Sequence, residues 1–552
     1  MRTLQPLLPL LTAGLALLLA ACAQPGPPGT PVHDKTVAIT ILHTNDHHGR
    51  FWQNSNGEYG MAARKTVVDA IRAEVAAAGG YSLLLDGGDV NTGMPESDLQ
   101  DAVPDFKGMN LLGYDAMAVG NHEFDKPPAV LAMQRKLAAF PMLSANIYQN
   151  GQRMFAPYHL FNLGGVRVAV MGLTTEDTQR LGNPANMPGV EFRNPVQEAA
   201  KLVPALRAKA DVVIAATHMG HYEDGRHGIQ APGDVEMARA VQGIDLVVGG
   251  HTQNPACMRA ENVLETAYLP GTACQPDRQN GAWIVQAHEW GKYVGRADFQ
   301  YRNGSFTLVK YALIPINLKK PVTDANGSTQ LVHYTTPIAE HPDMLALLQP
   351  YQQFGQSKLL VPVGTTDAKL EGDRSVVRKT ATNLGMLIGQ ANMHKTRSDF
   401  AVVNSGSIRD SLAAGTVTYK DILKVQPFGN TLATITLTGT EALAYLNAAA
   451  RMTPGAGGFA HFSGVDLVIA DGKVGQARIQ GALLEANKTY QMVINSFMAV
   501  GGDGYPKMTG HSSYVDTGFV DADVLRAFVT ANSPLQTARF APTNPTTNPV
   551  SQ

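Results

Sequence analysis

Six short apolar runs, each followed at once by polar residues, constrain the fold of this chain most strongly. The runs are VAITIL, YSLLL, AMAVG, RVAVMG, VVIAA and IDLVV, and they lead into HTND, DGGD, NHEFD, LTTED, THMG and GGHTQ. Continuous apolar runs of this length are typical of strands buried on both faces of a sheet. Helical patterns at residues 61 to 78 and 195 to 209 lie between some of the runs. The sequence therefore predicts an α/β layered domain.

The polar residues after these runs indicate a candidate metal site, because ligands of such sheets bind where strands end and loops begin. In an extended segment alternate side chains share a face, so Asp46 and His48 should point one way and His47 the other. Further donors follow the other runs: Asp89, Asn121, His122, His218, His251 and Gln253. Oxygen and nitrogen donors suit Zn, Mn, Co or Fe, and the absence of nearby cysteines argues against a structural cysteine site.

With 552 residues, the chain exceeds what one hydrophobic core usually serves, so two or more domains are expected. The order of apolar runs and helical patterns predicts a first domain over 35–340, a linker helix and hinge over 341–360, and a second domain over 361–535. Gly355 is expected to end the linker helix. In the second domain SVVRKTATNLGMLIGQAN predicts one helix, and TLATITLTG, VDLVIA and YQMVIN predict strands. Composition predicts a disordered tail over 536–552.

The N-terminus predicts export. Residues 1–22 have one charge, Arg2, an apolar stretch and small closing residues, as a signal peptide does. A transmembrane helix is the alternative, but Pro6 and Pro9 shorten the run below the ~20 residues of a span. Leu-Ala-Ala-Cys resembles the lipobox of bacterial lipoproteins, which implies lipidation of Cys22. Residues 23–34 would then form a flexible tether. The protein would lie in the envelope of a Gram-negative-type bacterium, facing periplasm or exterior. Alanine after Cys22 favours the outer membrane.

An oxidising compartment favours a disulfide between Cys257 and Cys274, although two unrelated thiols are the alternative. The formal net charge of −2 gives no broad basic surface, so a nucleic-acid polymer is not an expected partner.

The ordered motifs NDHH, GGD, GNHE, THMG and GGHTQ resemble the calcineurin-like metallophosphoesterases, and in particular bacterial periplasmic 5′-nucleotidases and UDP-sugar hydrolases. Residues 88 to 125 match that family almost throughout, and the resemblance covers about residues 35 to 530. It implies an N-terminal β-sandwich flanked by helices and a smaller C-terminal α/β domain that binds substrate.

The resemblance also implies two divalent metal ions, Zn, Mn, Co or similar. One would be held by Asp46, His48 and Gln253, the other by Asn121, His218 and His251, with Asp89 bridging both. A pair of metals suits phosphoryl transfer because it activates water and neutralises the charge that grows on the phosphate oxygens. His122, with Asp125, would stabilise the transition state or protonate the leaving oxygen. Structural roles are expected for His47, His221, His227 and Glu123.

Residues of the second domain form a candidate nucleotide clamp. Arg374 and Arg378 are four apart, so they would share a face of a helix's first turns, where cations need an anion such as phosphate; a surface salt bridge is the alternative. Arg409 adds a third cation. Two phenyl rings can sandwich a base, a carboxylate can accept ribose hydroxyls and an amide can bind a base edge. These roles fall to Phe428, Phe497, Asp503 and Asn430, and the resembling family uses matching residues. The loop GAGGFAHF resembles one near the base in that family.

These observations predict an exported, monomeric two-metal hydrolase that releases phosphate from 5′-nucleotides, with UDP-sugars as further candidate substrates. A 2′,3′-cyclic nucleotide phosphodiesterase/3′-nucleotidase is the near alternative, and the clamp residues favour the 5′-nucleotidase pattern. A non-catalytic surface protein that binds nucleotides or mediates adhesion is the alternative of another class. It would have no chemical need for the filled metal positions or for the pair His122 and Asp125. Contact with a membrane is expected only through the N-terminal lipid.

Overall fold

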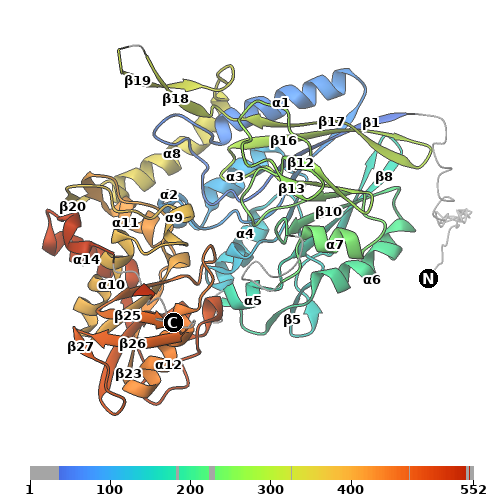
Figure 1. Ribbon diagram of the computed structural model, residues 1–552. Helices are drawn as coiled ribbons and strands as arrows, with labels where there is room; N and C mark the ends of the chain where they lie inside the picture. Colours follow the sequence, from blue (N-terminus) through green and yellow to red (C-terminus); the bar gives the residue numbers. More distant parts are fainter. Residues whose placement is uncertain are drawn as a thin grey trace, which may run out of the picture.

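The structure, a computed structural model, describes residues 36–181, 186–222, 231–324, 326–470, 473–542 and 546–547. Two layered bodies are joined by helix α8 (Pro342–Leu359). The first body begins with β1 and runs from blue to yellow in Figure 1, whereas the second begins with β20 (Pro362–Thr366) and is mostly orange to red. The predicted export signal, the tether, Cys22 and His227 lie outside the described residues. None of the described helices is long and apolar enough to cross a membrane.

Two six-stranded sheets lie face to face in the first body, with strand orders β17-β16-β1-β2-β3-β4 and β14-β15-β11-β10-β8-β7. The first sheet consists of β1 (Val37–Thr44), β2 (Tyr81–Asp86), β3 (Ala116–Ala118), β4 (Met142–Leu143), β16 (Tyr293–Arg302) and β17 (Ser305–Pro315). The second consists of β7 (Tyr158–Leu163), β8 (Val166–Thr174), β10 (Val212–His218), β11 (Leu246–Val248), β14 (Asp277–Gln279) and β15 (Ala282–Val285). All six apolar runs are strands, as predicted.

Helices cover the outer face of each sheet. Along β1, Ile39 and Ile41 pack into the core between the sheets, whereas Leu42 packs into the core beneath the helices. The first sheet is covered by α1 (Met61–Ala77), α3 (Val103–Leu112) and α8, and the second by α6 (Pro195–Arg207) and α7 (Asp234–Ala240). The helices predicted at 61–78 and 195–209 are therefore confirmed as α1 and α6. Other helices of this body are α2 (Pro95–Asp98), η1 (His122–Phe124), α4 (Pro128–Leu137) and α5 (Thr178–Leu181).

Small sheets complete the first body. The hairpin of β18 (Lys319–Thr323) and β19 (Thr329–His333) projects beyond α8. The others are formed by β5 (Ile147–Gln149), β6 (Gln152–Arg153), β9 (Val190–Phe192), β12 (Met258–Ala260) and β13 (Val263–Leu264). The predicted disulfide is present: Cys257 and Cys274 are bonded and close the loop that contains β12 and β13.

The parallel strands of both sheets end at the same place, and this brings the polar residues together. β1, β2, β3 and β4 are mutually parallel, and so are β8, β10, β11 and β15. Asp89 follows β2, His218 ends β10 and His251 follows β11. Their side chains meet although they lie far apart in sequence. The fold thus places the site at the carboxyl ends of the strands, as expected for such sheets.

Helix α8 does not end at Gly355, contrary to the prediction, but continues to Leu359. The glycine serves close packing, because a β-carbon at Gly355 would lie 2.6 Å from Cγ of Glu96. Met344 and Leu348 of α8 belong to a hydrophobic core of the first body. The helix is therefore part of that body rather than a free connection.

The second body has a five-stranded sheet of order β24-β21-β28-β23-β29 and a four-stranded sheet of order β27-β26-β25-β30. The five strands are β21 (Phe400–Asn404), β23 (Thr431–Thr438), β24 (Ala460–Ser463), β28 (Thr489–Asn495) and β29 (Val515–Val520). The four are β25 (Val465–Ala470), β26 (Lys473–Ile479), β27 (Ala482–Leu483) and β30 (Thr546–Thr547). The three predicted strands of this region are β23, β25 and β28. A further strand, β22 (Gly415–Thr418), pairs with β20.

Helices lie on both faces of the five-stranded sheet. The helices are α10 (Asn383–Thr396), α11 (Tyr419–Val425), α12 (Gly439–Ala450) and α14 (Asp521–Asn532). Ala401 and Val403 pack with α10, α11 and α14, whereas Phe400 and Val402 pack with α12. The alternation along β21 thus gives this body its own two cores.

Two predictions for the second body are wrong in detail. The single helix predicted over SVVRKTATNLGMLIGQAN is two, α9 (Arg374–Val377) and α10, because the Thr382 side chain accepts from the Gly385 N–H and starts a new helix. The tail predicted as disordered from residue 536 begins with an ordered turn, η5 (Thr537–Phe540), in which Phe540 is buried in the core.

Candidate active site

The loop after β1 holds Asp46 and His48 by left-handed turns, not by strand alternation as predicted. β1 ends at Thr44, and both residues have a φ of 51°. Backbone N–H groups of Asp46 and His48 donate to the carbonyls of Gly88 and Asp89 at 2.9 and 3.0 Å, so the loop follows the one after β2. His47 nevertheless points away, as expected, because its Nε2 lies 2.9 Å from Oδ1 of Asp105.

The first donor group consists of Asp46, His48 and one oxygen of Asp89. His48 Nδ1 donates to the carbonyl of Thr92 at 2.8 Å, so its Nε2 presents a lone pair to the site. That Nε2 lies 3.8 Å from Oδ1 of Asp46 and 3.9 Å from Oδ2 of Asp89. Asp46 Oδ1 is buried and has no hydrogen-bond partner, although Oδ2 accepts from Asn45 and from the His251 N–H. A buried carboxylate oxygen beside an imidazole lone pair fits a divalent cation.

The second donor group faces the same oxygen of Asp89. His218 Nδ1 donates to the carbonyl of Gly87 at 2.7 Å, and its Nε2 lies 2.9 Å from Asp89 Oδ2 and 3.2 Å from Nδ1 of His251. His251 Nδ1 is also 2.9 Å from Oδ1 of Asn121. Burial lowers the pKa of His218, yet Asp89 and Asp46 raise it to about 10 overall. The carboxylates therefore favour positive charge at this point, and the facing donors fit a second metal.

Gln253 lies beside the first donor group, but its amide nitrogen and not its oxygen faces that group. Gln253 Nε2 is 2.6 Å from Nε2 of His48, and its Oε1 accepts from Arg374 of the second body. A role as metal ligand requires the amide to turn by half a rotation, which exchanges two atoms that differ little in size. The role of Gln253 as a ligand therefore stays a prediction.

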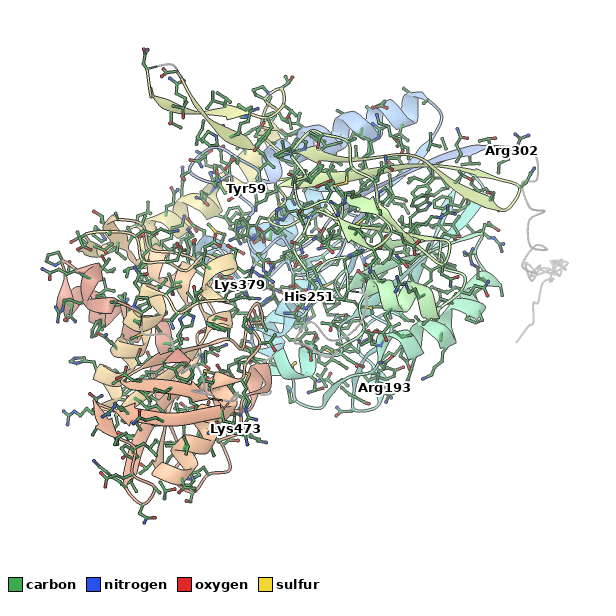
Figure 2. All side chains as sticks on the ribbon, viewed as in Figure 1. Tyr59, Arg193, His251, Arg302, Lys379 and Lys473 are labelled. Carbon is green, nitrogen blue, oxygen red and sulfur yellow. A yellow bond between two sulfur atoms is a disulfide. The ribbon has the colours of Figure 1, made fainter. Side chains whose placement is uncertain are left out.

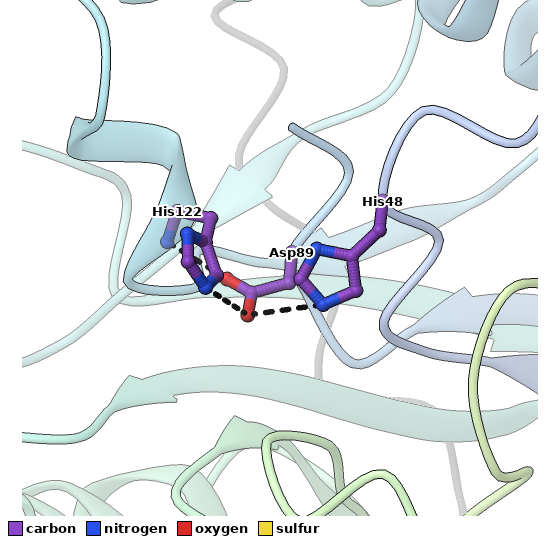
Figure 3. Close-up of side chains that lie close together, drawn as sticks. All are labelled: His48, Asp89 and His122. Carbon is purple, nitrogen blue, oxygen red and sulfur yellow. Dashed lines mark hydrogen bonds and ion pairs between the residues drawn. The ribbon is translucent and has the colours of Figure 1, made fainter. Parts of the chain in front are cut away.

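His122 faces the same bridging oxygen from the rim of the site (Figure 3). Its Nδ1 lies 2.6 Å from Oδ2 of Asp125, and its Nε2 lies 3.9 Å from Oδ2 of Asp89, as far as that of His48. The two imidazoles differ in the partner of Nδ1, which is the carboxylate of Asp125 for His122 and the carbonyl of Thr92 for His48. Burial lowers the pKa of His122, but Asp125 and Asp89 outweigh it and raise the pKa above its usual value. This pairing favours the charged imidazole, which can donate a proton.

Glu123 and His221, for which structural roles are predicted, make contacts of that kind. Glu123 accepts from the backbone N–H groups of Asp89, Val90 and Gly120, so it holds the loop that carries the bridging carboxylate. His221 Nε2 lies 2.9 Å from Oδ2 of Asp277.

The donor groups open into a cavity of about 570 Å³ between the two bodies. From the first body it is lined by Asp89, Asn121, His122, Asp125, His251 and Gln253. From the second body all seven predicted clamp residues line it: Arg374, Arg378, Arg409, Phe428, Asn430, Phe497 and Asp503. Figure 2 shows His251 where the two bodies face one another. The volume is that of a ligand site for a small molecule.

Sequence reasoning missed several residues that line the cavity. They are Tyr222, Thr252, Asn254, Asn404, Gly406, Ser407 and the segment Thr453–Gly457. Asn404 starts the motif NSGSIRDSL and the segment 453–457 runs into GAGGFAHF, so both lie in stretches that the sequence had already indicated. Gly406 and Ser407 belong to the same motif as Asn404, whereas Tyr222, Thr252 and Asn254 follow His218 and His251 by a few positions and carry no signal of their own.

The arginines form a cationic wall, although not as a helix face. α9 has four residues, Arg378 lies at its C-terminal cap, and its N-terminus is capped by the Asp373 side chain, which accepts from the Ser375 N–H at 2.8 Å. The Ser375 N–H is thus already bound and is not free for a phosphate. Burial and the neighbouring Arg374 lower the pKa of Arg409 to about 10, and burial with Arg374 and Arg409 lowers that of Arg378. Mutually repelling cations of this kind stabilise a bound anion.

One residue of the nucleotide clamp, Phe428, also contacts the first body. The ring of Phe428 stacks on the imidazole of His122, with centroids 5.8 Å apart and planes 9° from parallel. The ring of Phe497 lies over Gly502, where a β-carbon would be 2.5 Å from it.

Substitution of His48 by alanine is expected to lower hydrolysis far more than substitution of His47. His48 presents a lone pair to the donor group, whereas His47 Nε2 pairs with Asp105 and its Nδ1 lies 3.3 Å from Arg64, so its loss should mainly lower stability. Turnover at saturating metal, metal content and melting temperature of the two variants provide the measurement. The reverse order of activity would show that the pair Asp46 and His48 is misassigned.

Family models match both bodies. A model described as calcineurin-like phosphoesterase matches residues 39–255, and one described as 5′-nucleotidase, C-terminal domain, matches residues 362–510.

Similar proteins span nearly the whole chain. Protein UshA of Yersinia enterocolitica is 56% identical over 96% of this chain and 98% of its own length. A 5′-nucleotidase of Vibrio cholerae is 54% identical over 96% of this chain and 97% of its own. Among solved structures, a 5′-nucleotidase precursor from Thermus thermophilus matches with a TM-score of 0.72 and 30% identity, over 90% of this chain and 96% of that one.

Proposed function

Because the chain belongs to the 5′-nucleotidase family of metal-dependent phosphoric ester hydrolases, we propose that the donor groups around Asp89 are its catalytic metal site and the facing wall of the cavity its nucleotide clamp. The observation that supports this most is the cavity itself. One end holds two His/Asp groups that fit divalent metals, and the other holds three arginines, two phenyl rings and a carboxylate. A nucleoside 5′-phosphate carries the complementary groups: a phosphate for the metals and arginines, a base for the phenyl rings and ribose hydroxyls for the carboxylate.

Each residue has a proposed part in the reaction. Two divalent metal ions, when bound, activate the attacking water and neutralise the charge that grows on the phosphate oxygens. Asp46, His48 and Gln253 would hold one of them, Asn121, His218 and His251 the other, and Asp89 both. His122 holds a proton on Nδ1 towards Asp125 and, in its charged form, presents a second on Nε2 to the leaving oxygen.

The second body would orient the substrate. Arg374, Arg378 and Arg409 stabilise the phosphate charge, and Phe428 and Phe497 contact the base. Asp503 would accept the ribose hydroxyls, and Asn430 would bind the base edge. Closure of these groups around the phosphate would place it at the metal site and exclude bulk solvent, while the attacking water stays in the site.

The substrate range extends, in this proposal, from 5′-nucleotides to UDP-sugars, since the same arginines can bind a pyrophosphate. Hydrolysis of AMP, UDP-glucose, 2′,3′-cyclic AMP and 3′-AMP tests it, with the nucleotide products separated by chromatography and metal added back after chelation. Turnover of AMP well above that of the cyclic and 3′ substrates supports a 5′-nucleotidase. Preference for 2′,3′-cyclic AMP would favour the phosphodiesterase alternative. Absence of turnover with every substrate would favour the non-catalytic binding protein.

We further propose domain boundaries near residues 35–340 and 361–535, with a pivot after α8. α8 is packed in the first core, so the flexible point falls on Leu360 and Val361, which are exposed at 52% and 55%. Across the contact between α2 and α11, Lys420 Nζ donates to Oε1 of the buried Glu96. This ion pair and the bond from Arg374 to Gln253 stabilise the arrangement in which the clamp faces the metals.

Cysteine pairs placed across the contact of α2 with α11 test the pivot. Oxidation should lower kcat by about tenfold or more if the second body must move to load substrate and release product, and reduction should restore it. Single-cysteine variants and the unsubstituted protein, treated identically, control for the native bond between Cys257 and Cys274. Unchanged turnover in a fully crosslinked protein would contradict the moving clamp.

Export and lipidation at Cys22 remain part of the proposal, as do the outer membrane and a monomeric state, in which one chain supplies both walls of the cavity. Cys22→Ser should move the protein from the membrane fraction of a Gram-negative host to a soluble one, with full activity retained. Membrane association that persists in this variant would contradict the lipid anchor.

A further inference from the structure

Two buried asparagines of the second body have no part in the function described so far, although one of them, Asn404, also lines the cavity. They open the two Asn-Ser motifs of the second body, NSGSIRDSL and NSFMAVGGDGYP, as Asn404 and Asn495. Asn404 ends β21 and Asn495 ends β28, and these strands are parallel neighbours in the sheet. Their exposed fractions are 1% and 5%. Buried amides at the ends of adjacent strands need partners, and here they find one another.

Their hydrogen bonds form a single chain that ends on the clamp. Asn495 Nδ2 donates to Asn404 Oδ1 at 2.9 Å, and Asn404 Nδ2 donates to Oδ2 of Asp503 at 2.9 Å. At the other end, Asn495 Oδ1 accepts from the Met498 N–H at 2.8 Å and so caps α13 (Ser496–Ala499), which carries Phe497. A backbone N–H can only donate and an ionised carboxylate can only accept, so both amides have one possible orientation.

The carboxylate at the end of this chain has little freedom. Asp503 has a φ of 55°, in the region that side chains rarely adopt. A β-carbon at Gly406 would lie 3.1 Å from Oδ2 of Asp503, and one at Gly457 would lie 3.2 Å from it. Glycine at these positions lets the backbone of two loops close around the carboxylate. Asn404 is a neutral donor, so it fixes the carboxylate without cancelling its charge.

We propose that Asn404 and Asn495 are positioning residues that fix Asp503 and Phe497 relative to one another. This fixed arrangement makes the enzyme select phosphoesters with an intact ribose 2′,3′-diol. Asn404 aims the carboxylate into the cavity, where a pair of vicinal hydroxyls can donate to it. Asn495 fixes the helix that carries the base-stacking ring relative to the same carboxylate. The inference rests on the proposed function, since it assigns the ribose as the group that Asp503 binds.

Asn404→Ser tests the inference, because serine adds no bulk at this buried position but is too short to donate to Asp503 or to accept from Asn495. The quantity measured is the ratio of kcat/KM for AMP to that for 2′,3′-dideoxy-AMP, with p-nitrophenyl phosphate as a substrate that has no nucleoside. The ratio should fall about tenfold, the effect of weakening hydrogen bonds to a charged group. Turnover of the other two substrates should stay within about twofold. Asn392→Ser, at a buried asparagine of α10, is the matched control and should leave the ratio unchanged.

A cycle with Asp503→Ala separates positioning from general damage. If Asn404 acts through Asp503, Asn404→Ser should have no further effect on the ratio once Asp503 is replaced. Equal loss with all three substrates, an unchanged ratio, or additive effects in the cycle would overturn the inference. An unsubstituted enzyme that cleaves AMP and dideoxy-AMP equally well would overturn the inference and leave the proposed function intact, whereas one that cleaves neither would overturn both.

Discussion

Alanine in place of His122 is expected to lower the rate of AMP hydrolysis by about 10²-fold or more, the usual effect of removing a positioned acid or an electrostatic group. Metal content and nucleotide affinity should change little, because the donors His48 and His218 are bound to backbone carbonyls and do not depend on this ring. Asp125→Asn should cause a smaller loss, because it keeps a partner for Nδ1 of His122 but removes the charge that raises its pKa.

The leaving group distinguishes the two roles open to His122. If Nε2 protonates the leaving oxygen, His122→Ala should impair hydrolysis of AMP much more than that of p-nitrophenyl phosphate, whose leaving group needs no proton. If His122 stabilises charge on the phosphate instead, both substrates should suffer equally. Normal hydrolysis of AMP by His122→Ala would show that the proposed mechanism is wrong.

Asparagine in place of Asp89 should have the other large effect. Asp89 Oδ2 faces His218 at 2.9 Å and both His48 and His122 at 3.9 Å, so its charge serves both donor groups. Loss of a metal removes several kcal/mol of charge stabilisation, which corresponds to a fall in rate of about 10²- to 10³-fold. Metal content should fall from two ions per chain to one or fewer.

Asp86→Asn is the matched control for this experiment. Asp86 lies three residues earlier, at the end of β2, and is also buried, but its oxygens accept from Thr44 and from the Gly88 N–H instead of facing the donors. Its substitution should lower stability and leave the metal content near that of the unsubstituted protein. Equal metal loss in both variants would mean that the loop, and not the bridging charge, holds the ions.

The strands and the donor residues could be predicted because their signals are local. An apolar run followed by Asp, Asn or His is visible within ten residues, and the topology of parallel strands then brings the ends together. The separation of His47 from its neighbours was also predicted, but for the wrong reason. The left-handed conformations of Asp46 and His48 depend on hydrogen bonds to the loop after β2, which no local pattern indicates.

The features that sequence did not predict depend on contacts distant in the chain. Gly355 resembles a helix terminator, but it packs on Glu96 some 260 residues away. Phe540 falls in a stretch that resembles a disordered tail, yet the core of the second body buries it. Asn404 and Asn495 were overlooked because an asparagine after a strand usually indicates a turn, and only the adjacency of β21 and β28 gives the pair a purpose.

Metal titration of the chelated protein tests the central claim most directly. Zn²⁺, Mn²⁺ or Co²⁺ is added in measured equivalents, and phosphate release from AMP is followed at each step. The two donor groups that share Asp89 predict no turnover without metal and a rise that is complete at two equivalents per chain. Turnover that survives complete chelation, or that reaches its maximum at one equivalent, would contradict a two-metal active site.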